Sequence, residues 1–116
     1  MLSDTEVAIN AINTFGIESQ MKKAVEELLE LSMDCVRLLN GESIKPQKVA
    51  EEIADVRLVM LQLQIILSQM ESKFPQLIET AYRYKVERTA LVIERKMEAN
   101  NNGASTATNR TVETDL

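Results

Sequence analysis

The sequence predicts an all-α protein in which four helices form a bundle and a disordered tail follows. Gly and Pro number only three and two in 116 residues, so the turn residues of a β-rich fold are missing. Apolar residues recur with the helical period instead. Hydrophobic residues make up 45% and aromatic residues 3%, so a small core must rest on aliphatic side chains. A chain this short buries a modest share of its surface, and we expect an oligomer.

Local signals set the bounds of the first two predicted helices. Ser3 and Glu6 form a capping box, and Phe15-Gly16 ends the first helix. The second begins at Ile17 and closes at Asn40-Gly41 after about six turns. Its apolar residues form one stripe, which predicts the side that faces the core: Ile17, Met21, Ala24, Val25, Leu28, Leu31, Cys35 and Leu38. The single cysteine, Cys35, lies in this stripe and is expected to be a reduced core residue.

Two proline residues mark the starts of the remaining helices. Pro46 suits the first turn of a third helix, and Pro75 can start a fourth that runs to about Met97. The third helix carries one apolar stripe, formed by Val49, Ile53, Val56, Met60, Leu63 and Leu67. Over residues 56–67 the apolar stripe widens to most of the helix surface, and we expect a partner subunit to bury this surface. From residue 99 the chain is polar, which predicts a domain over 1–98 and a disordered tail over 99–116.

Composition excludes several functions. The chain has no His, so His-based nucleophiles, general bases and zinc sites are ruled out. Catalysis would fall to carboxylates and amines. The net charge of −5 disfavours nucleic acid partners. The longest apolar run, 56–67, is shorter than the roughly 20 residues that cross a bilayer, and no secretory signal is evident. We therefore expect a cytoplasmic protein without a membrane partner.

Two acidic groups with the same internal spacing lie on the second and third predicted helices. They are Glu26-Glu27-x-x-Glu30 and Glu51-Glu52-x-x-Asp55. Residues three or four apart are neighbours on a helix, so each group makes one patch, at a cost of roughly 0.2–0.5 kcal/mol per like-charged pair. Lysines stand four residues before several of these acids, so an ordinary solvated, charge-paired helix face is the alternative interpretation. Asp55 argues against a solvated face. Aspartate is a poor helix former, yet Asp55 stands in mid-helix, immediately before the apolar run that is expected to be buried. A carboxylate in that position needs a cation or hydrogen-bond donors to offset its charge.

An antiparallel pairing of these two helices would bring the patches level. Glu30 precedes Gly41 by about the number of residues that separate Gly41 from Glu52. Four or more carboxylates that converge without His or thiolate form a hard oxygen site. Such a site favours Mg²⁺, with Mn²⁺ as a possible substitute, over zinc.

The paired pattern Glu-Glu-x-x-Glu, 21 residues, Glu-x-x-Asp resembles the signature of MazG-like all-α nucleoside triphosphate pyrophosphohydrolases. The resemblance extends over roughly residues 13–90, with Phe15-Gly16 and Gln20 ahead of the motifs and Tyr84-Lys85-x-x-Arg88 after them. It implies a helical bundle that assembles as a homodimer or a dimer of dimers. It also implies hydrolysis between the α and β phosphates of a nucleoside triphosphate, which gives the monophosphate and pyrophosphate.

The resemblance also implies functional roles for individual residues of this chain. It implies that Mg²⁺ is held by the positions Glu27, Glu30, Glu52 and Asp55, and Glu26 also belongs to the motif. Glu26 and Glu27 are the candidate catalytic carboxylates, because a carboxylate can orient water for in-line attack.

Cations and an amide complete the candidate site. Lys85 and Arg88 stand three apart on one helix face and could reach the same phosphates, although an ordinary solvated pair is an equal alternative. Gln20 and Lys23 precede Glu27 by seven and four residues, which makes both candidates for substrate binding. The four aromatic rings are more typical of a core than of base stacking: Phe15, Phe74, Tyr82 and Tyr84.

Two other functions stay open. The acidic face could dock a basic partner in a non-enzymatic helical interaction module, whose apolar third helix would dimerise it. A regulator that kept the fold and lost turnover is the other alternative.

Overall fold

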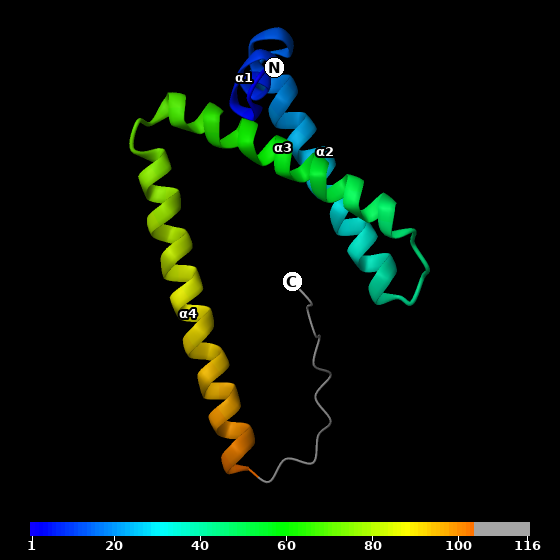
Figure 1. Cartoon of the computed structure of the whole chain (residues 1–116), viewed down its shortest axis with the longest axis vertical. Coiled ribbons are helices and arrows are strands. Elements are labelled where there is room, and N and C mark those ends of the chain that lie inside the picture. Colours follow the sequence, from blue (N-terminus) through cyan, green and yellow to red (C-terminus); the bar gives the residue numbers. More distant parts are fainter. Residues whose placement is uncertain (104–116) are drawn as a thin grey trace. The chain divides into compact units, whose positions relative to one another are not determined.

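The computed structural model describes residues 1–103, and over that range the chain forms four helices and no strand. The all-α prediction is therefore confirmed. The helices, shown in Figure 1, are α1 (Asp4–Phe15), α2 (Ile17–Leu39), α3 (Pro46–Met70) and α4 (Phe74–Asn102). The chain divides into two compact units. The first, Met1–Gln76, holds α1, α2 and α3, and the second begins at Leu77 within α4.

Local chemistry places the ends of α1 and α2 where the sequence predicts them. The backbone N–H of Glu6 donates to Ser3 Oγ at 3.1 Å, and the N–H of Ser3 donates to Glu6 Oε2 at 3.3 Å. These two bonds are the predicted capping box. Gly16 and Gly41 have φ values of +93° and +81°. Glycine adopts that region without the strain a Cβ would cause, so the chain turns at these two points.

The core of the first unit lies where α1 meets the antiparallel pair formed by α2 and α3. Each of the three helices contacts the other two, and Figure 1 shows α1 beside the first half of α2 and the second half of α3. The buried apolar side chains within the described range are few: Ala8, Ile12, Ala24, Val59 and Ile66. This core is small for a unit of this length, as the scarcity of aromatic residues predicts.

The inward face of α2 differs from the predicted one. The side chains of α2 that are buried or half-buried on its inward face follow one another at intervals of four and three residues. Most of them are polar: Gln20, Ala24, Glu27, Leu31 and Asp34. Most of the predicted apolar stripe is instead exposed, namely Ile17, Met21, Val25, Leu28, Cys35 and Leu38. The core assignment of Cys35 and this stripe is wrong for the single chain. Periodicity identifies an apolar face but not the surface that covers it.

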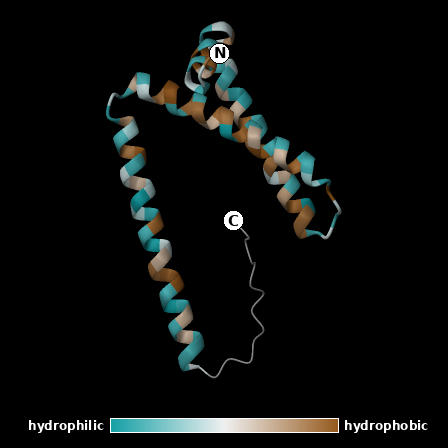
Figure 2. Ribbon diagram, in the orientation of Figure 1, coloured by the Kyte–Doolittle hydropathy of each residue, from teal (hydrophilic) through white to brown (hydrophobic). Residues whose placement is uncertain are grey.

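Apolar side chains are spread widely around α3. Its buried residues are Val59, Gln62 and Ile66, while much of the predicted stripe is half-buried and Ile53 and Met60 are exposed. Figure 2 shows apolar residues recurring along the whole helix. By length and composition, α3 could cross a membrane, the one such helix in the described range. However, Glu52 and Asp55 lie on it, and charged side chains are costly inside a bilayer.

The fourth helix is longer than predicted. It begins at Phe74 and continues to Asn102, with the N–H of Gly103 donating to the carbonyl of Ala99 at 3.0 Å. The predicted onset of disorder at residue 99 is therefore wrong for 99–102, because the backbone hydrogen bonds of a helix do not need apolar side chains. The rest of the predicted tail, 104–116, lies outside the described residues. None of the residues of α4 is buried in the part of the chain that the structure describes.

Candidate metal site

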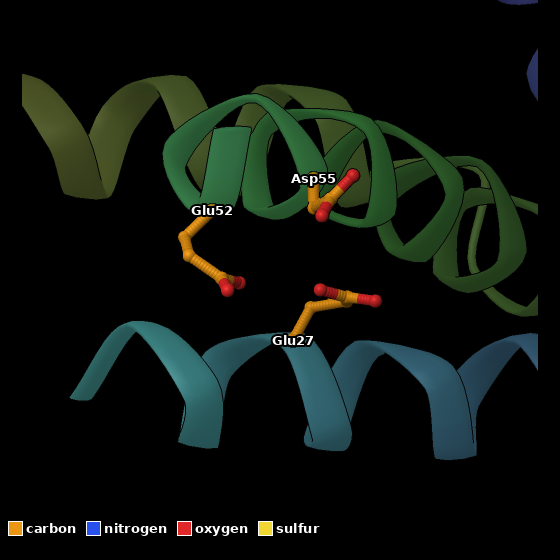
Figure 3. A group of neighbouring side chains, drawn as sticks. All are labelled: Glu27, Glu52 and Asp55. Atoms are coloured by element: carbon orange, nitrogen blue, oxygen red, sulfur yellow. The ribbon is translucent and has the colours of Figure 1, made fainter. Parts of the chain in front are cut away.

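Three carboxylates converge between α2 and α3. Glu27, Glu52 and Asp55 each bring one oxygen to within 4.8 Å of the others. Figure 3 shows Glu27 pointing from α2 toward α3, while Glu52 and Asp55 point back from α3. The two acidic patches therefore face each other at the same level, as the spacing from Gly41 predicts.

The convergence belongs to a regular series of facing positions along the two helices. Asp34 faces Lys48, with Lys48 Nζ 2.8 and 2.9 Å from the two Asp34 oxygens. One turn further from the loop, Glu30 lies close enough to Glu52 to raise the pKa of the Glu52 carboxyl, and the next turn brings Glu27 near Asp55. Successive positions are separated by four and then three residues on both helices, a spacing that keeps them on one face.

Two other motif residues stand beside this group. Glu30 is exposed and lies outside the three-oxygen group, but its negative charge raises the pKa of Glu52. Glu26 is also exposed and lines a pocket of about 870 Å³ at the N-terminal end of α2. The pocket also takes in Glu27 and the cations Lys22 and Lys23. It therefore places acidic and basic side chains around one open space next to the carboxylate group.

Burial and like charge raise the pKa values of Glu27 and Glu52, the two half-buried carboxyls of the group, whereas Asp55 is exposed. Burial raises the pKa of Glu27, and the negative charges of Asp55, Glu30 and Glu52 raise it further, against the opposing effect of Lys23. Burial also raises the pKa of Glu52, followed by the hydrogen bond and the charge of Glu30, with Lys48 opposing. The metal-free site thus lacks enough positive charge to balance its acids.

The residues present fit a hard divalent cation. The Oε2 atoms of Glu27 and Glu52 are buried, and neither has a hydrogen-bond partner among residues 1–103. A buried carboxylate oxygen without a partner is costly. A proton or a cation would remove that cost, and an all-oxygen set of carboxylates suits Mg²⁺ or Mn²⁺.

The remaining candidate substrate-binding residues have different surroundings. Gln20 is 6% exposed, so it belongs to the packed interior of the first unit. Lys85 and Arg88 are exposed residues of α4. Their proposed contacts with substrate stay predictions. Three of the four aromatic rings, those of Phe15, Tyr82 and Tyr84, are exposed and not in the core, and Phe74 is half-buried. Phe15 lines the pocket that contains Glu26 and Glu27.

A buried carboxylate paired with two half-exposed cations lies beside the site and was not predicted from the sequence. Asp34 is 1% exposed and bonds Lys48 from α3 and Arg37, whose guanidinium is 3.3 Å away. The hydrogen bond to Asp34 raises the pKa of Lys48. A signal was present, because Asp34 and Lys48 both stand seven residues from Gly41. In an antiparallel pair, equal spacing from the turn predicts facing positions.

Known proteins supply no further assignment. The chain matches no protein-family model, no curated protein and no solved structure.

The raised pKa values predict how the stability of the metal-free protein depends on pH. Glu27 and Glu52 hold protons more tightly in the folded chain than in the unfolded one. Their contribution is fully present below the unfolded pKa of about 4.5 and is lost as pH rises through the higher folded values. Unfolding midpoints of the parent, recorded in EDTA between about pH 4 and pH 8, should fall more steeply than those of Glu27→Gln. Equal slopes would contradict the pKa assignment.

Proposed function

We propose that the protein is a Mg²⁺-dependent nucleoside triphosphate pyrophosphohydrolase of the MazG-like type, which cleaves between the α and β phosphates. The observation that carries the proposal is the convergence of Glu27, Glu52 and Asp55, in which two buried oxygens have no hydrogen-bond partner among residues 1–103. These residues come from the two halves of the paired acidic motif. Acidic oxygen sites of this kind commonly hold Mg²⁺ together with substrate phosphates.

Each site residue has a proposed role. Glu27, Glu30, Glu52 and Asp55 hold Mg²⁺, with Mn²⁺ as a substitute. When bound, the ion would supply positive charge that offsets the charge of the polyphosphate and would lower the pKa of the attacking water. Glu26 and Glu27 orient that water and accept its proton.

Cationic and amide side chains bind the substrate in this proposal. Lys23 lines the pocket beside Glu27, where its ammonium group is available to a phosphate. Lys85 and Arg88 bind phosphate from the fourth helix. Gln20 is 6% exposed, so its amide would contact a substrate only if a local rearrangement uncovered it.

A nucleotide screen tests the proposal directly. Purified protein is incubated with each ribonucleoside and deoxyribonucleoside triphosphate in the presence of Mg²⁺, and the products are separated by ion exchange. We expect a nucleoside monophosphate and pyrophosphate in equal amounts, and no product in EDTA. Release of orthophosphate with the diphosphate would indicate that a different bond is cleaved. A lack of turnover with every nucleotide would overturn the assignment.

We also propose that the protein works as a homodimer or a dimer of dimers. The support is the apolar side of α2, where Val25, Leu29, Met33 and Val36 are each more than half exposed. A second copy could cover these side chains, and burial of apolar surface drives such association.

Val25→Asp is expected to lower the native mass of the protein, because it places a charge on this apolar side. The mass is measured by light scattering after gel filtration. Lys22→Asp is the matched control, since it puts the same residue on α2 at a position already charged and exposed. An unchanged mass for Val25→Asp would place the interface elsewhere.

A non-enzymatic interaction module is the second candidate function. It is favoured by the apolar side chains of α4 that are exposed, among them Tyr82, Val86 and Ile93, which lie along one side of the helix. Such a helix could occupy a groove of a partner protein. The nucleotide screen separates the two, because only the enzyme requires Mg²⁺ and releases pyrophosphate.

A further inference from the structure

We propose that Lys48, held in place by Asp34, is a positioning residue that orients the Glu52 carboxylate for a divalent cation. The inference rests on the metal site of the proposed function. It concerns the side chains behind the carboxylates, which the acidic motifs leave out.

Asp34 provides the fixed end of this arrangement. Its carboxylate is 1% exposed on α2 and accepts hydrogen bonds from Lys48 Nζ at 2.8 and 2.9 Å and from Arg37 at 3.3 Å. A buried carboxylate needs such cations, because its desolvation is otherwise uncompensated. Lys48 therefore reaches from α3 to α2 and is held at its far end.

Lys48 also contacts the acidic group. Its Nζ lies 3.7 Å from Oε1 of Glu52, one turn further along α3. The other oxygen of Glu52, Oε2, is the buried atom without a partner among the described residues. The ammonium group thus attracts one oxygen of Glu52 and leaves the second available. Metal ligands are commonly held by an outer contact of this kind, whose loss weakens metal binding about 10–100-fold.

The positive charge of Lys48 has an opposite effect that makes the proposal testable. A cation near the site repels a divalent ion. If Lys48 acted only through its positive charge, its removal would therefore tighten metal binding. If Lys48 orients Glu52, its removal would instead weaken metal binding. The sign of the change in metal affinity therefore separates the two roles.

The test measures the dissociation constant for Mn²⁺ by the electron paramagnetic resonance signal of the free ion. We expect Lys48→Met to raise the constant about tenfold or more, and Lys48→Arg, which keeps the charge and can reach Asp34, to restore much of the affinity. Lys73→Met is the matched control, since Lys73 is exposed in the turn that follows α3 and does not line the pocket beside the carboxylates. An unchanged or lower constant for Lys48→Met would overturn the proposal.

A second variant separates positioning from stability. Lys48→Met leaves the buried Asp34 with Arg37 alone, so the double variant Asp34→Asn with Lys48→Met removes the stranded charge. We expect the double variant to regain thermal stability in EDTA and still bind Mn²⁺ weakly. Recovery of both together would mean that Lys48 acts only on stability, and would overturn the proposal.

The outcomes for the site and for Lys48 are distinct. If the parent protein binds no Mn²⁺, the metal site is wrong and both proposals fail. If the parent binds Mn²⁺ and Lys48→Met binds it equally well, only the role of Lys48 fails. If the parent binds Mn²⁺ and hydrolyses no nucleotide, the role of Lys48 in metal binding stands and the proposed reaction is wrong.

Discussion

Asp55→Asn is expected to lower kcat for Mg²⁺-dependent hydrolysis at least about 100-fold. Asn keeps the shape of the side chain and removes one of the three converging charges. Metal ions contribute several kcal/mol of charge stabilisation in such reactions, and about 1.4 kcal/mol corresponds to a factor of ten in rate. The metal-free variant should be as stable as the parent or more so, because the charge of Asp55 acts against that of Glu27.

The variant is compared with Glu51→Gln by steady-state pyrophosphate release and by thermal unfolding with and without Mg²⁺. Glu51 lies one position before Glu52 on α3 and is exposed, with its carboxylate hydrogen-bonded to Gln47 at 3.2 Å. The control should retain activity and the rise in unfolding midpoint that ligand binding produces. Full activity in Asp55→Asn would show that the site is misassigned. Unfolding of that variant in EDTA would show that Asp55 is structural.

Ile66→Ala is expected to destabilise the first unit by about 3 kcal/mol, since large-to-small changes in a core cost about 2–5 kcal/mol. Ile66 is 1% exposed and is one of the few apolar side chains that are buried within residues 1–103. A loss of this size should lower the unfolding midpoint by more than about 10 °C in a unit of this length. Circular dichroism at 222 nm, a wavelength that reports helix content, follows the transition.

Ile53→Ala is the matched control, because it makes the same change on the same helix at a position that is 46% exposed. Its expected cost is below about 1 kcal/mol, as for most surface substitutions. A comparable loss in both variants would mean that a partner subunit covers Ile53. The two cases are distinguished by repeating the measurement over a range of protein concentrations, because only stability that depends on association varies with concentration.

Local signals were sufficient to predict most helix ends. The capping box at Ser3, the turns at Gly16 and Gly41 and the start at Pro46 depend on backbone geometry and hydrogen bonds within a few residues. The end of α4 was placed too early. Its last turn consists of polar residues that give no apolar period, and the helical backbone continues through them to Asn102.

The direction in which α2 faces was not predictable from its period. Its apolar residues indicate a face that should be buried, but α3 contacts the neighbouring side, where Ala24 and Asp34 lie. A hydrophobic pattern within one helix does not identify which surface covers it. Only the packing of α1, α2 and α3 decides which residues form the core of the chain.

The sequence by itself determined that the acidic groups face each other, because a short turn at Gly41 and a helical repeat fix which positions of an antiparallel pair are level. Only the tertiary structure decided that Glu27 and Glu52 are partly withdrawn from water, with raised pKa values. It also decided that Asp34 is buried beneath Lys48. The physical reason is that desolvation depends on side chains from other helices, which spacing along one helix does not contain.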